Sequence, residues 1–383
     1  MHTKEAENLL ERKWDLTQDW RWQIKNRITD IELLPSYPMF REDEKRLLSK
    51  VCKRFHMAIT PYYASLINWD DPKDPLFMQS VPSISEITLR ENNTSIDPLG
   101  ENDFTVHKGL IHRYEDRAVL VLTNFCPMYC RFCTRRREWS RHEKILNKAE
   151  IDQAILYIKA NDKIRDVIIS GGDPLTLSLS YLEYLLKNLR KISHVEIIRI
   201  GTRVPVVLPQ RIDSELLNML DRYGPIWLNT QFNHPREITS ESKSACDLIL
   251  RHGIPINNQS VLLKGVNDKP ELISELNNKL LKIKVRPYYL FQCDQVLGTE
   301  YFRTSIFKGI EIIEYLRKHS SGLAVPTYAI DVPGKGGKIA LMANHIMDYS
   351  DTQVILKDNF GENIIYNEPL SNRLKKNTIA KVP

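Results

Sequence analysis

Three cysteines of this chain, Cys126, Cys130 and Cys133, lie close together with the spacing C-x3-C-x2-C. A structural zinc site takes four ligands, commonly in paired CxxC elements, but the next cysteine along the chain is Cys246. Three clustered thiolates fit a [4Fe–4S] cluster that leaves one iron open, and an open iron can bind a substrate or a cofactor. The spacing therefore predicts an iron–sulfur centre in this segment.

The elements that position the cysteines follow a regular alternation. Short apolar runs alternate with segments of helical period, such as the one marked by Leu182, Leu185 and Leu189, and the runs lie at residues 118–122, 167–169, 195–200, 226–228, 260–263 and 285–291. This alternation predicts a parallel sheet with right-handed crossovers. Parallel α/β folds place their ligand sites at the C-terminal ends of the strands. The first run leads into the cysteines, so we expect an enzyme site at this mouth.

We expect an α/β fold in which residues 106–340 form a partial (β/α)6-type parallel barrel. Pro287 falls in the sixth run, and because proline cannot donate a ladder hydrogen bond, this run predicts a weak strand or an edge strand. Residues 1–105 predict a helical N-terminal extension, followed by an extended proline-rich connector. Residues 341–383 predict an irregular C-terminal tail, which is a candidate for contact between subunits.

The composition is that of a globular protein. Of 383 residues, 42% are hydrophobic and 27% are charged, which is enough apolar material for a sizeable core. No apolar run reaches the roughly 18 residues that a membrane-spanning helix needs, and the first residues lack the apolar core of a secretory signal. We therefore expect a cytoplasmic protein without a membrane contact.

The net charge of +6 is a mild excess for this length, so no nucleic-acid partner is expected.

The cysteine motif resembles the signature of radical S-adenosylmethionine enzymes, in which the open iron of the cluster binds S-adenosylmethionine. Two longer stretches are more specific: residues 130–137 and residues 331–338 resemble the lysine 2,3-aminomutase family. The similarity covers most of the chain and includes the Trp-rich N-terminal segment and residues 111–117 and 258–268. The resemblance implies three cofactors, namely a [4Fe–4S] cluster, S-adenosylmethionine and pyridoxal phosphate.

The resemblance also implies roles for particular residues of this chain. Cys126, Cys130 and Cys133 match the cluster ligands, while Phe132, Gly171, Gly172 and Asp173 match positions beside S-adenosylmethionine. Lys338 matches the lysine that binds pyridoxal phosphate, and Arg113, Arg117 and Gln259 match positions around its phosphate. Arg135 matches the arginine that binds the substrate carboxylate, and Asp294 and Asp331 match the acidic pair that binds the ε-ammonium group of lysine.

Some residues depart from the family pattern. Lys335 occupies a position that is often glycine, and it could compete with Lys338 for the cofactor. Gln231 stands where clostridial-type lysine enzymes commonly have a histidine near the adenosyl group. No cysteine follows Cys293, whereas those enzymes have a C-terminal zinc-binding cysteine cluster, so we expect no zinc and a different subunit packing.

The activity that the resemblance implies is interconversion of L-lysine and β-lysine by 2,3-migration of the α-amino group. It also implies an external electron donor such as flavodoxin or ferredoxin, and a homo-oligomer. Three alternatives stay open. The enzyme could act on arginine or another basic amino acid, or it could supply β-lysine for modification of an elongation factor. A non-catalytic iron–sulfur binding or sensing protein is the alternative from a different class.

Overall fold

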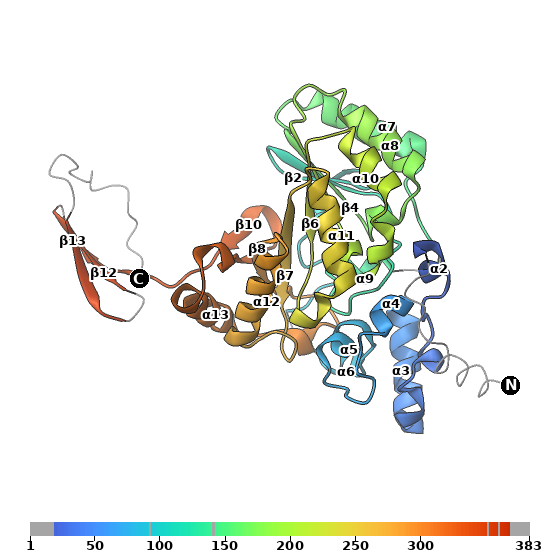
Figure 1. The fold of residues 1–383 in the computed structure, drawn as a ribbon, viewed down its shortest axis with the longest axis horizontal. Helices are drawn as coiled ribbons and strands as arrows, with labels where there is room; N and C mark the ends of the chain where they lie inside the picture. Colours follow the sequence, from blue (N-terminus) through green and yellow to red (C-terminus); the bar gives the residue numbers. More distant parts are fainter. Residues whose placement is uncertain (1–18, 92, 140–141, 351, 359–360, 368–383) are drawn as a thin grey trace.

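A computed structural model describes residues 19–91, 93–139, 142–350, 352–358 and 361–367 of the chain. Its centre is a ten-stranded sheet whose spatial order follows the sequence from β1 to β10 (Figure 1). Strands β3 to β9 are parallel, while β1, β2 and β10 join antiparallel. The strands are β1 (Thr105–His107), β2 (Leu110–Tyr114), β3 (Arg117–Val121), β4 (Asp166–Ser170), β5 (Ile197–Gly201), β6 (Ile226–Thr230), β7 (Ile256–Leu262), β8 (Arg286–Gln292), β9 (Thr327–Val332) and β10 (Gly337–Ala340).

Helices that connect the parallel strands cover one face of this sheet (Figure 1). They are α7 (Lys148–Ala160), α8 (Leu179–Leu189), α9 (Val204–Val207), α10 (Ser214–Asp221), α11 (Ser240–Arg251), α12 (Pro270–Lys282) and α13 (Ile306–His319). The leucines of helical period in α8, including Leu182, Leu185 and Leu189, are buried in the main core. Burial of such apolar stripes against the sheet is the main favourable term holding the layers together. The predicted α/β fold with a mostly parallel sheet is confirmed.

The predictions for the later strands need three corrections. β7 begins at Ile256, so Asn257 and Gln259 lie within the strand. β8 is not an edge strand, because it pairs with both β7 and β9. Pro287 fits there because a register shift in the β7 ladder lies beside it and the pairing with β9 starts only at Tyr289. β9 is a seventh parallel strand that was not predicted. Its apolar run is short and lies between polar residues, so it does not stand out in the sequence.

The two edges of the sheet approach each other, which gives the partial barrel. β2 lies near one edge and β9 near the other, yet the Arg113 guanidinium of β2 forms an ion pair of 3.0 Å with Asp331 of β9. Tyr114, also in β2, lies against Gly337 of β10, where an added Cβ would be 2.9 Å from the tyrosine oxygen. The hydrogen-bonded ladder itself runs only from β1 to β10. The sheet is therefore strongly curved, and side chains bridge its opening.

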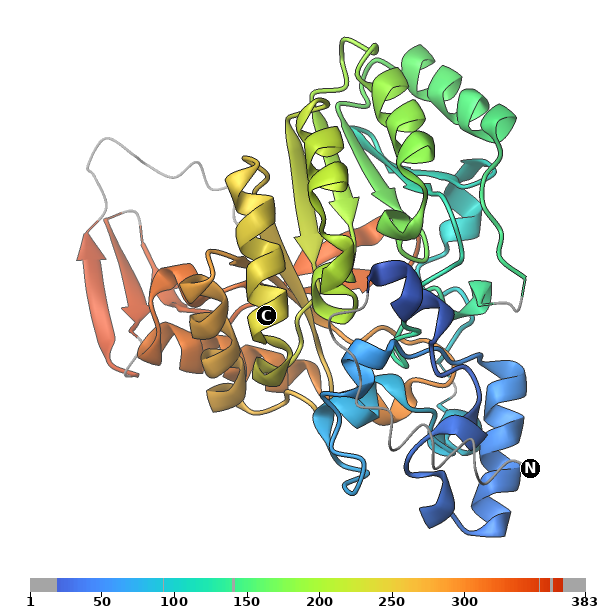
Figure 2. The same cartoon turned by 45° about the vertical axis from the view of Figure 1, so that its right-hand side comes forward.

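The N-terminal extension packs at the C-terminal ends of the strands (Figure 2). It comprises α2 (Trp20–Lys25), α3 (Glu42–Arg54), α4 (Pro61–Ala64), α5 (Pro75–Ser80) and α6 (Ser85–Thr88). The connector was predicted to be extended, but it contains α4, α5 and α6. Thr60 and Asp74 cap the first two of these helices, and a proline occupies the first helical position of each, so the prolines start helices instead of preventing them.

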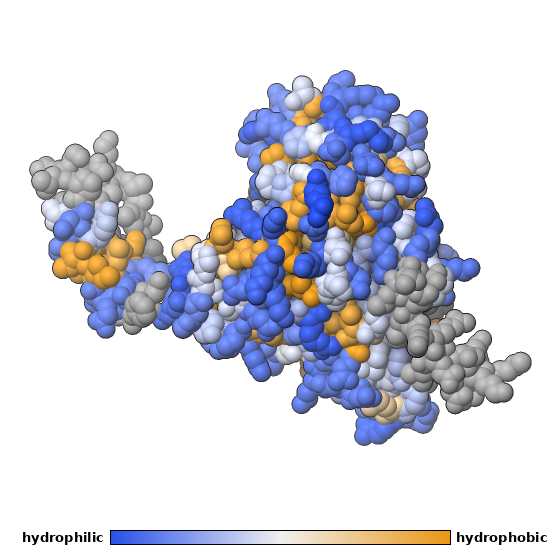
Figure 3. All heavy atoms as spheres, viewed as in Figure 1, coloured by the Kyte–Doolittle hydropathy of each residue, from blue (hydrophilic) through white to orange (hydrophobic). Residues whose placement is uncertain are grey.

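The prediction of an irregular tail is wrong for residues 346–367. β11 (Ile346–Tyr349), β12 (Gln353–Lys357) and β13 (Asn363–Asn367) form a second, antiparallel sheet, which stands apart from the body of the molecule (Figure 1). Exposed apolar side chains gather on this sheet, among them Ile364 and Ile365 (Figure 3). Its contact with another subunit stays a prediction, and the basic end of the tail lies outside the described residues.

No helix in the described part of the chain is long and apolar enough to cross a membrane.

Candidate functional site

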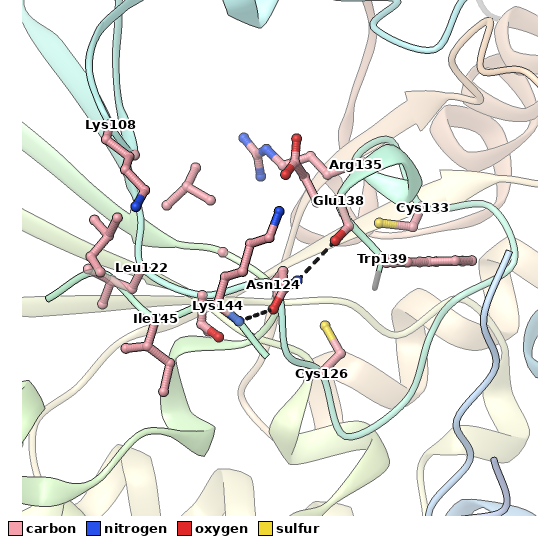
Figure 4. A pocket seen from close by; sticks show the side chains of 16 residues that line it. Lys108, Leu122, Asn124, Cys126, Cys133, Arg135, Glu138, Trp139, Lys144 and Ile145 are labelled. Carbon is pink, nitrogen blue, oxygen red and sulfur yellow. Dashed lines mark hydrogen bonds between the residues drawn. The ribbon is translucent and has the colours of Figure 1, made fainter. Parts of the chain in front are cut away.

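The cysteine loop follows β3 and lies beside the C-terminal end of β4. Cys126 and Cys133 line one side of a pocket there, and Lys108 lies on the opposite side (Figure 4). Burial raises the pKa of the Cys126 thiol well above its ordinary value, and burial raises the pKa of Cys133 to about 11. Thiols in such surroundings become thiolates when a metal binds them. Three free, half-buried thiols on one loop fit the expected iron–sulfur cluster.

The described residues include no group of three or more His, Cys, Asp or Glu side chains spaced to hold a single metal ion. In a [4Fe–4S] cluster the cysteine thiolates bind different irons, so its ligands do not converge on one atom.

Arg203 adds a positive charge to the cysteine loop. Its Nη1 donates to Cys130 Sγ at 2.8 Å, and its Nη2 donates to Glu237 Oε1 at 2.7 Å. Gln79 Oε1, from the N-terminal extension, accepts from the same Nη2 at 2.7 Å. Arg203 also lies 5.4 Å from the ring centroid of Phe132. The sequence places Arg203 only at the end of a strand, and nothing in it points to the contact with Cys130.

The two glycines after β4 let this strand end approach the cysteine loop. An added Cβ on Gly172 would lie 2.1 Å from the carbonyl oxygen of Phe125, and one on Gly171 would lie 2.7 Å from that of Thr123. The close approach is thus to the backbone of the loop that carries Cys126. Both glycines also line the pocket with the thiols, so they face the space where a ligand would bind.

Asp173 completes this turn. Its carboxylate accepts from Thr202 Oγ1 at 2.7 Å and from the backbone N–H groups of Arg203 at 2.8 Å and Leu175 at 3.1 Å. Burial raises the pKa of Asp173 to about 6, although these hydrogen bonds oppose the shift. Asp173 therefore ties the ends of β4 and β5 together beside the cysteine loop.

Gly172→Ala tests this packing. The added methyl group overlaps the Phe125 carbonyl, whose oxygen already accepts from the Asp173 N–H at 2.8 Å, so the loop must move. We expect a loss of about 1–3 kcal/mol of stability, as for other overpacked sites, and reduced iron incorporation. Thermal unfolding and iron analysis measure both. Gly322→Ala is the control because nothing lies within 4 Å of its added Cβ. Equal unfolding temperatures and iron contents of the two variants would show that the close contact at Gly172 does not matter.

A second group of predicted residues meets where β9 turns into β10. Lys338 lies directly opposite Asp331 in this antiparallel pair, and its Nζ is 2.6 Å from Asp331 Oδ2. The Arg113 guanidinium binds the other Asp331 oxygen, Oδ1, at 3.0 Å and donates to the Gly334 carbonyl at 2.8 Å. Lys338 Nζ also lies 5.5 Å from the ring centroid of Phe291 in β8. The structure thus brings together Asp331, Lys338 and Arg113.

Asp294 follows β8 and is half-buried. Its Oδ2 accepts from Thr134 Oγ1 at 3.0 Å, and Thr134 directly follows Cys133. No lysine, arginine or histidine nitrogen among the described residues is in ion-pair contact with Asp294; the ion pairs of the nearby acids belong to Asp331 and Glu101. Burial raises the pKa of Asp294 to about 7. Among the described residues, this carboxylate has no ion-pair partner.

Arg135 also lines the pocket (Figure 4). Its Nη2 donates to Glu101 Oε1 at 2.6 Å, and its Nε lies 3.0 Å from Oε2 of the same carboxylate. Glu101 lies in a 3-10 helix, η3 (Glu101–Phe104), just before β1. The sequence alone does not point to Glu101 or Thr134, because each contacts a partner that is distant in the sequence.

Two predicted phosphate residues lie outside these contacts. Arg117 forms an ion pair of 2.7 Å with Asp116 and lies 3.7 Å from the ring centroid of Tyr114. Gln259 lies in β7, paired with Tyr289 of β8. Gln231 follows β6, and its carbonyl accepts from Arg203 Nε at 3.1 Å. The structure records no direct contact of Arg117 or Gln259 with Lys338 among the described residues.

Comparison with known proteins identifies the family. Residues 120–276 match the radical SAM superfamily, and residues 313–380 match the family described as Lysine-2,3-aminomutase. The L-lysine 2,3-aminomutase of Clostridium subterminale is 50% identical over 353 residues, which cover 92% of this chain and 85% of that protein. The chain belongs to the lysine 2,3-aminomutase family. Its members named here are isomerases, so the chain is an enzyme, and the alternative of a non-catalytic iron–sulfur protein falls away.

Lysine 2,3-aminomutase relatives include more than one named substrate. The L-lysine 2,3-aminomutase of Methanococcus maripaludis is 49% identical over 369 residues, covering 96% of this chain and 84% of that protein. The glutamate 2,3-aminomutase of Clostridioides difficile is 44% identical over 344 residues, covering 89% of this chain and 81% of that protein. Membership of the family implies a [4Fe–4S] cluster, S-adenosylmethionine and pyridoxal phosphate. The choice between amino acid substrates depends on the residues of the site.

Proposed function

We propose that this protein is an L-lysine 2,3-aminomutase, which interconverts L-lysine and β-lysine by moving the α-amino group between C2 and C3. The observation that supports it is the half-buried carboxylate of Asp294, which accepts a hydrogen bond from the Thr134 hydroxyl and has no ion-pair partner among the described residues. A charge that is partly removed from water is stabilised by a counter-charge. The distal ammonium group of lysine would supply the missing cation.

The geometry and the family support the proposed cofactor residues. Cys126, Cys130 and Cys133 would hold the cluster, and the turn of Gly171, Gly172 and Asp173 with Phe132 would bind S-adenosylmethionine beside it. When bound, S-adenosylmethionine supplies a radical that can take hydrogen from the substrate, and pyridoxal phosphate supplies conjugation that stabilises an unpaired electron beside nitrogen. The protein contributes binding, orientation and exclusion of water.

Lys338 would attach pyridoxal phosphate covalently. Its Nζ lies over Phe291 and against Asp331, so the lysine is positioned by side chains from two other strands. Arg113, Arg117 and Gln259 would bind the phosphate, for which arginine supplies charge and a bidentate set of donors. Arg113 is the member of this set that already contacts the loop leading to Lys338, through the Gly334 carbonyl.

The substrate would bind between Arg135 and the acidic pair. The Arg135 guanidinium suits an α-carboxylate because it offers parallel N–H donors. Asp294 and Asp331 would bind the ε-ammonium group, and Asp294 is the one without a cation of its own. A second carboxylate at this position would be repelled, so glutamate is expected to be a poor substrate. Sites built on buried polar groups can discriminate by about 10⁴–10⁵.

A substrate panel tests the proposal. Anaerobically reconstituted protein is incubated with S-adenosylmethionine, pyridoxal phosphate and a reductant, and then separately with lysine, arginine, ornithine and glutamate. Chromatography of the derivatised products should show a β-amino acid from lysine at a rate well above the others. Faster turnover of arginine, ornithine or glutamate would reject lysine as the substrate while leaving the aminomutase chemistry intact.

The pH dependence of kcat/KM gives a further prediction. Burial raises the pKa of Asp294 to about 7; Asp331 acts in the same direction, whereas the hydrogen bond from Thr134 opposes it. An acid with a raised pKa stays neutral until the pH passes that value, and a neutral carboxyl cannot pair with an ammonium group. We therefore expect kcat/KM for lysine to rise with pH through about 7 and then to level off.

Asp294→Asn should remove this rise and leave a low kcat/KM across the range. Measured pH profiles of the two proteins, from about pH 5.5 to 8.5, provide the comparison. Asp70→Asn, at an exposed position, is the control and should keep the wild-type profile. A profile that keeps its rise near pH 7 in Asp294→Asn would assign the titration to another group.

A further inference from the structure

One edge of the Arg135 guanidinium is already bound within the protein. Glu101 Oε1 accepts from Nη2 at 2.6 Å, and its two oxygens lie 3.1 and 3.0 Å from Nε. This is a side-on pair that uses the Nε–Nη2 edge of the guanidinium. Such two-point pairs fix the plane of the guanidinium as well as its position.

Glu101 is itself firmly held. It is 7% exposed, and the Arg137 Nη2 donates to its Oε2 at 2.7 Å. The backbone N–H groups of Glu101 and Asn102 donate to the carboxylate of Asp97 at 3.1 and 3.0 Å, which fixes the start of η3. Burial raises the pKa of Glu101, but the charges and hydrogen bonds of Arg135 and Arg137 outweigh it and hold the pKa at about 2. The carboxylate is therefore charged at any working pH.

Arg135 lines the pocket, and its Nη1 is the guanidinium nitrogen that Glu101 does not bind. The recorded contact of its Nη1 is Ser170 Oγ at 3.4 Å, which is long for a hydrogen bond. The pocket around it is lined by Cys133, Gly171 and Gly172 (Figure 4). The Nη1–Nη2 edge thus has donor capacity on the side where the cofactors and the substrate would lie. A carboxylate could bind there while Glu101 keeps the opposite edge.

We propose that Glu101 is a positioning residue, which holds Arg135 through the Nε edge so that its terminal edge binds the α-carboxylate of the substrate. The inference rests on the proposed function only in taking an α-amino acid as the substrate. Glu101 lies in the segment before β1, so this extension contributes to the site through its hold on Arg135. A competing view is that Glu101 occupies Arg135 and must be displaced by the substrate. The two views predict opposite effects of removing the carboxylate.

Calorimetric binding to the reconstituted protein without reductant tests the proposal, because no turnover is needed. Binding of L-lysine is compared with binding of L-lysinamide, in which a neutral amide replaces the carboxylate, for wild type, Glu101→Gln and Asp103→Asn. Asp103 is an exposed acid on the same helix and serves as the matched control. We expect Glu101→Gln to weaken lysine binding by about 10- to 100-fold, as for other misplaced binding groups, and to leave lysinamide binding within about threefold.

The ratio of the two dissociation constants separates positioning from damage. A structural defect would weaken both ligands alike and leave the ratio unchanged, which would overturn the proposal. Tighter lysine binding by Glu101→Gln would overturn it in favour of displacement. Arg135→Lys should also lower the dissociation constant of lysinamide divided by that of lysine, because it weakens lysine binding selectively. Adding Glu101→Gln to Arg135→Lys should change this ratio little. If another amino acid of the substrate panel binds best, the proposed function fails, but the same test is run with that amino acid and its amide.

Discussion

Lys338→Arg should bind no pyridoxal phosphate covalently and should form β-lysine at least about 10³-fold more slowly than the wild type, the scale of losing a catalytic group. The substitution keeps a positive charge near Asp331, which Lys338 contacts at 2.6 Å. Arginine cannot form the covalent bond to the cofactor aldehyde, because its guanidinium is not nucleophilic near neutral pH. The variant thus separates the covalent role of Lys338 from its charge. Visible absorption after addition of pyridoxal phosphate, followed by gel filtration, measures the attachment.

Lys335→Arg decides between the two lysines of this loop. Both lie in the segment that joins β9 to β10, with Lys335 in the 3-10 helix η10 (Gly334–Gly336) and Lys338 in β10. Only Lys338 is paired in register with Asp331 across the two strands. We therefore expect Lys335→Arg to keep the absorption band. Loss of the band in Lys335→Arg and its retention in Lys338→Arg would assign the attachment to Lys335. Lys318→Arg, at an exposed position of α13, controls for a general effect of the change.

The predicted sheet was accurate where strands are short and apolar. The runs that became β3 to β6 lie within about two residues of the observed strands, because their apolar residues pack against helices that have an equally clear period. β9 and the start of β7 escaped detection since they carry polar residues, such as Asn257 and Asp331. At these positions the hydrophobic pattern alone does not show a strand.

The tail illustrates a different limit. Its strands carry exposed side chains on both faces, so they lack the alternation that marks a half-buried sheet. Local sequence therefore contained little signal for β11 to β13.

The site could be predicted in its residue types but not in its internal partners. Cys126, Cys130, Cys133 and Lys338 stand out because their chemistry requires those residue types in short motifs. Glu101, by contrast, is an ordinary acid in a short 3-10 helix, and only the fold brings it to Arg135. The same holds for Thr134 beside Asp294. These partners tie the cysteine loop to distant segments, and the largest such connection is centred on Glu86.

Glu86 is fully buried at 0% exposure and binds two arginines of the cysteine motif. Its carboxylate accepts from Arg131 Nε at 2.9 Å and Nη2 at 2.5 Å, and it also accepts from Arg136. Arg131 donates further to the His56 carbonyl at 2.9 Å, and Arg136 donates to the Gly298 carbonyl at 2.7 Å. The network thus joins α6 and the segment after β8 to the loop that carries the three cysteines.

Glu86→Gln should destabilise the protein by about 3–5 kcal/mol, because it leaves two buried guanidinium groups without a counter-charge. The amide has nearly the same shape as the carboxylate, so the effect reports the lost charge. We also expect a lower iron content after reconstitution, since Arg131 and Arg136 flank Cys133 and hold its loop. The midpoint of urea denaturation and iron analysis measure the two effects. Glu42→Gln, at an exposed position on α3, should leave both nearly unchanged. If Glu86→Gln matched this control, the loop would not depend on the buried charges, and the backbone contacts of Tyr129 and Arg131 with Ala58 and Gln79 would have to hold it alone.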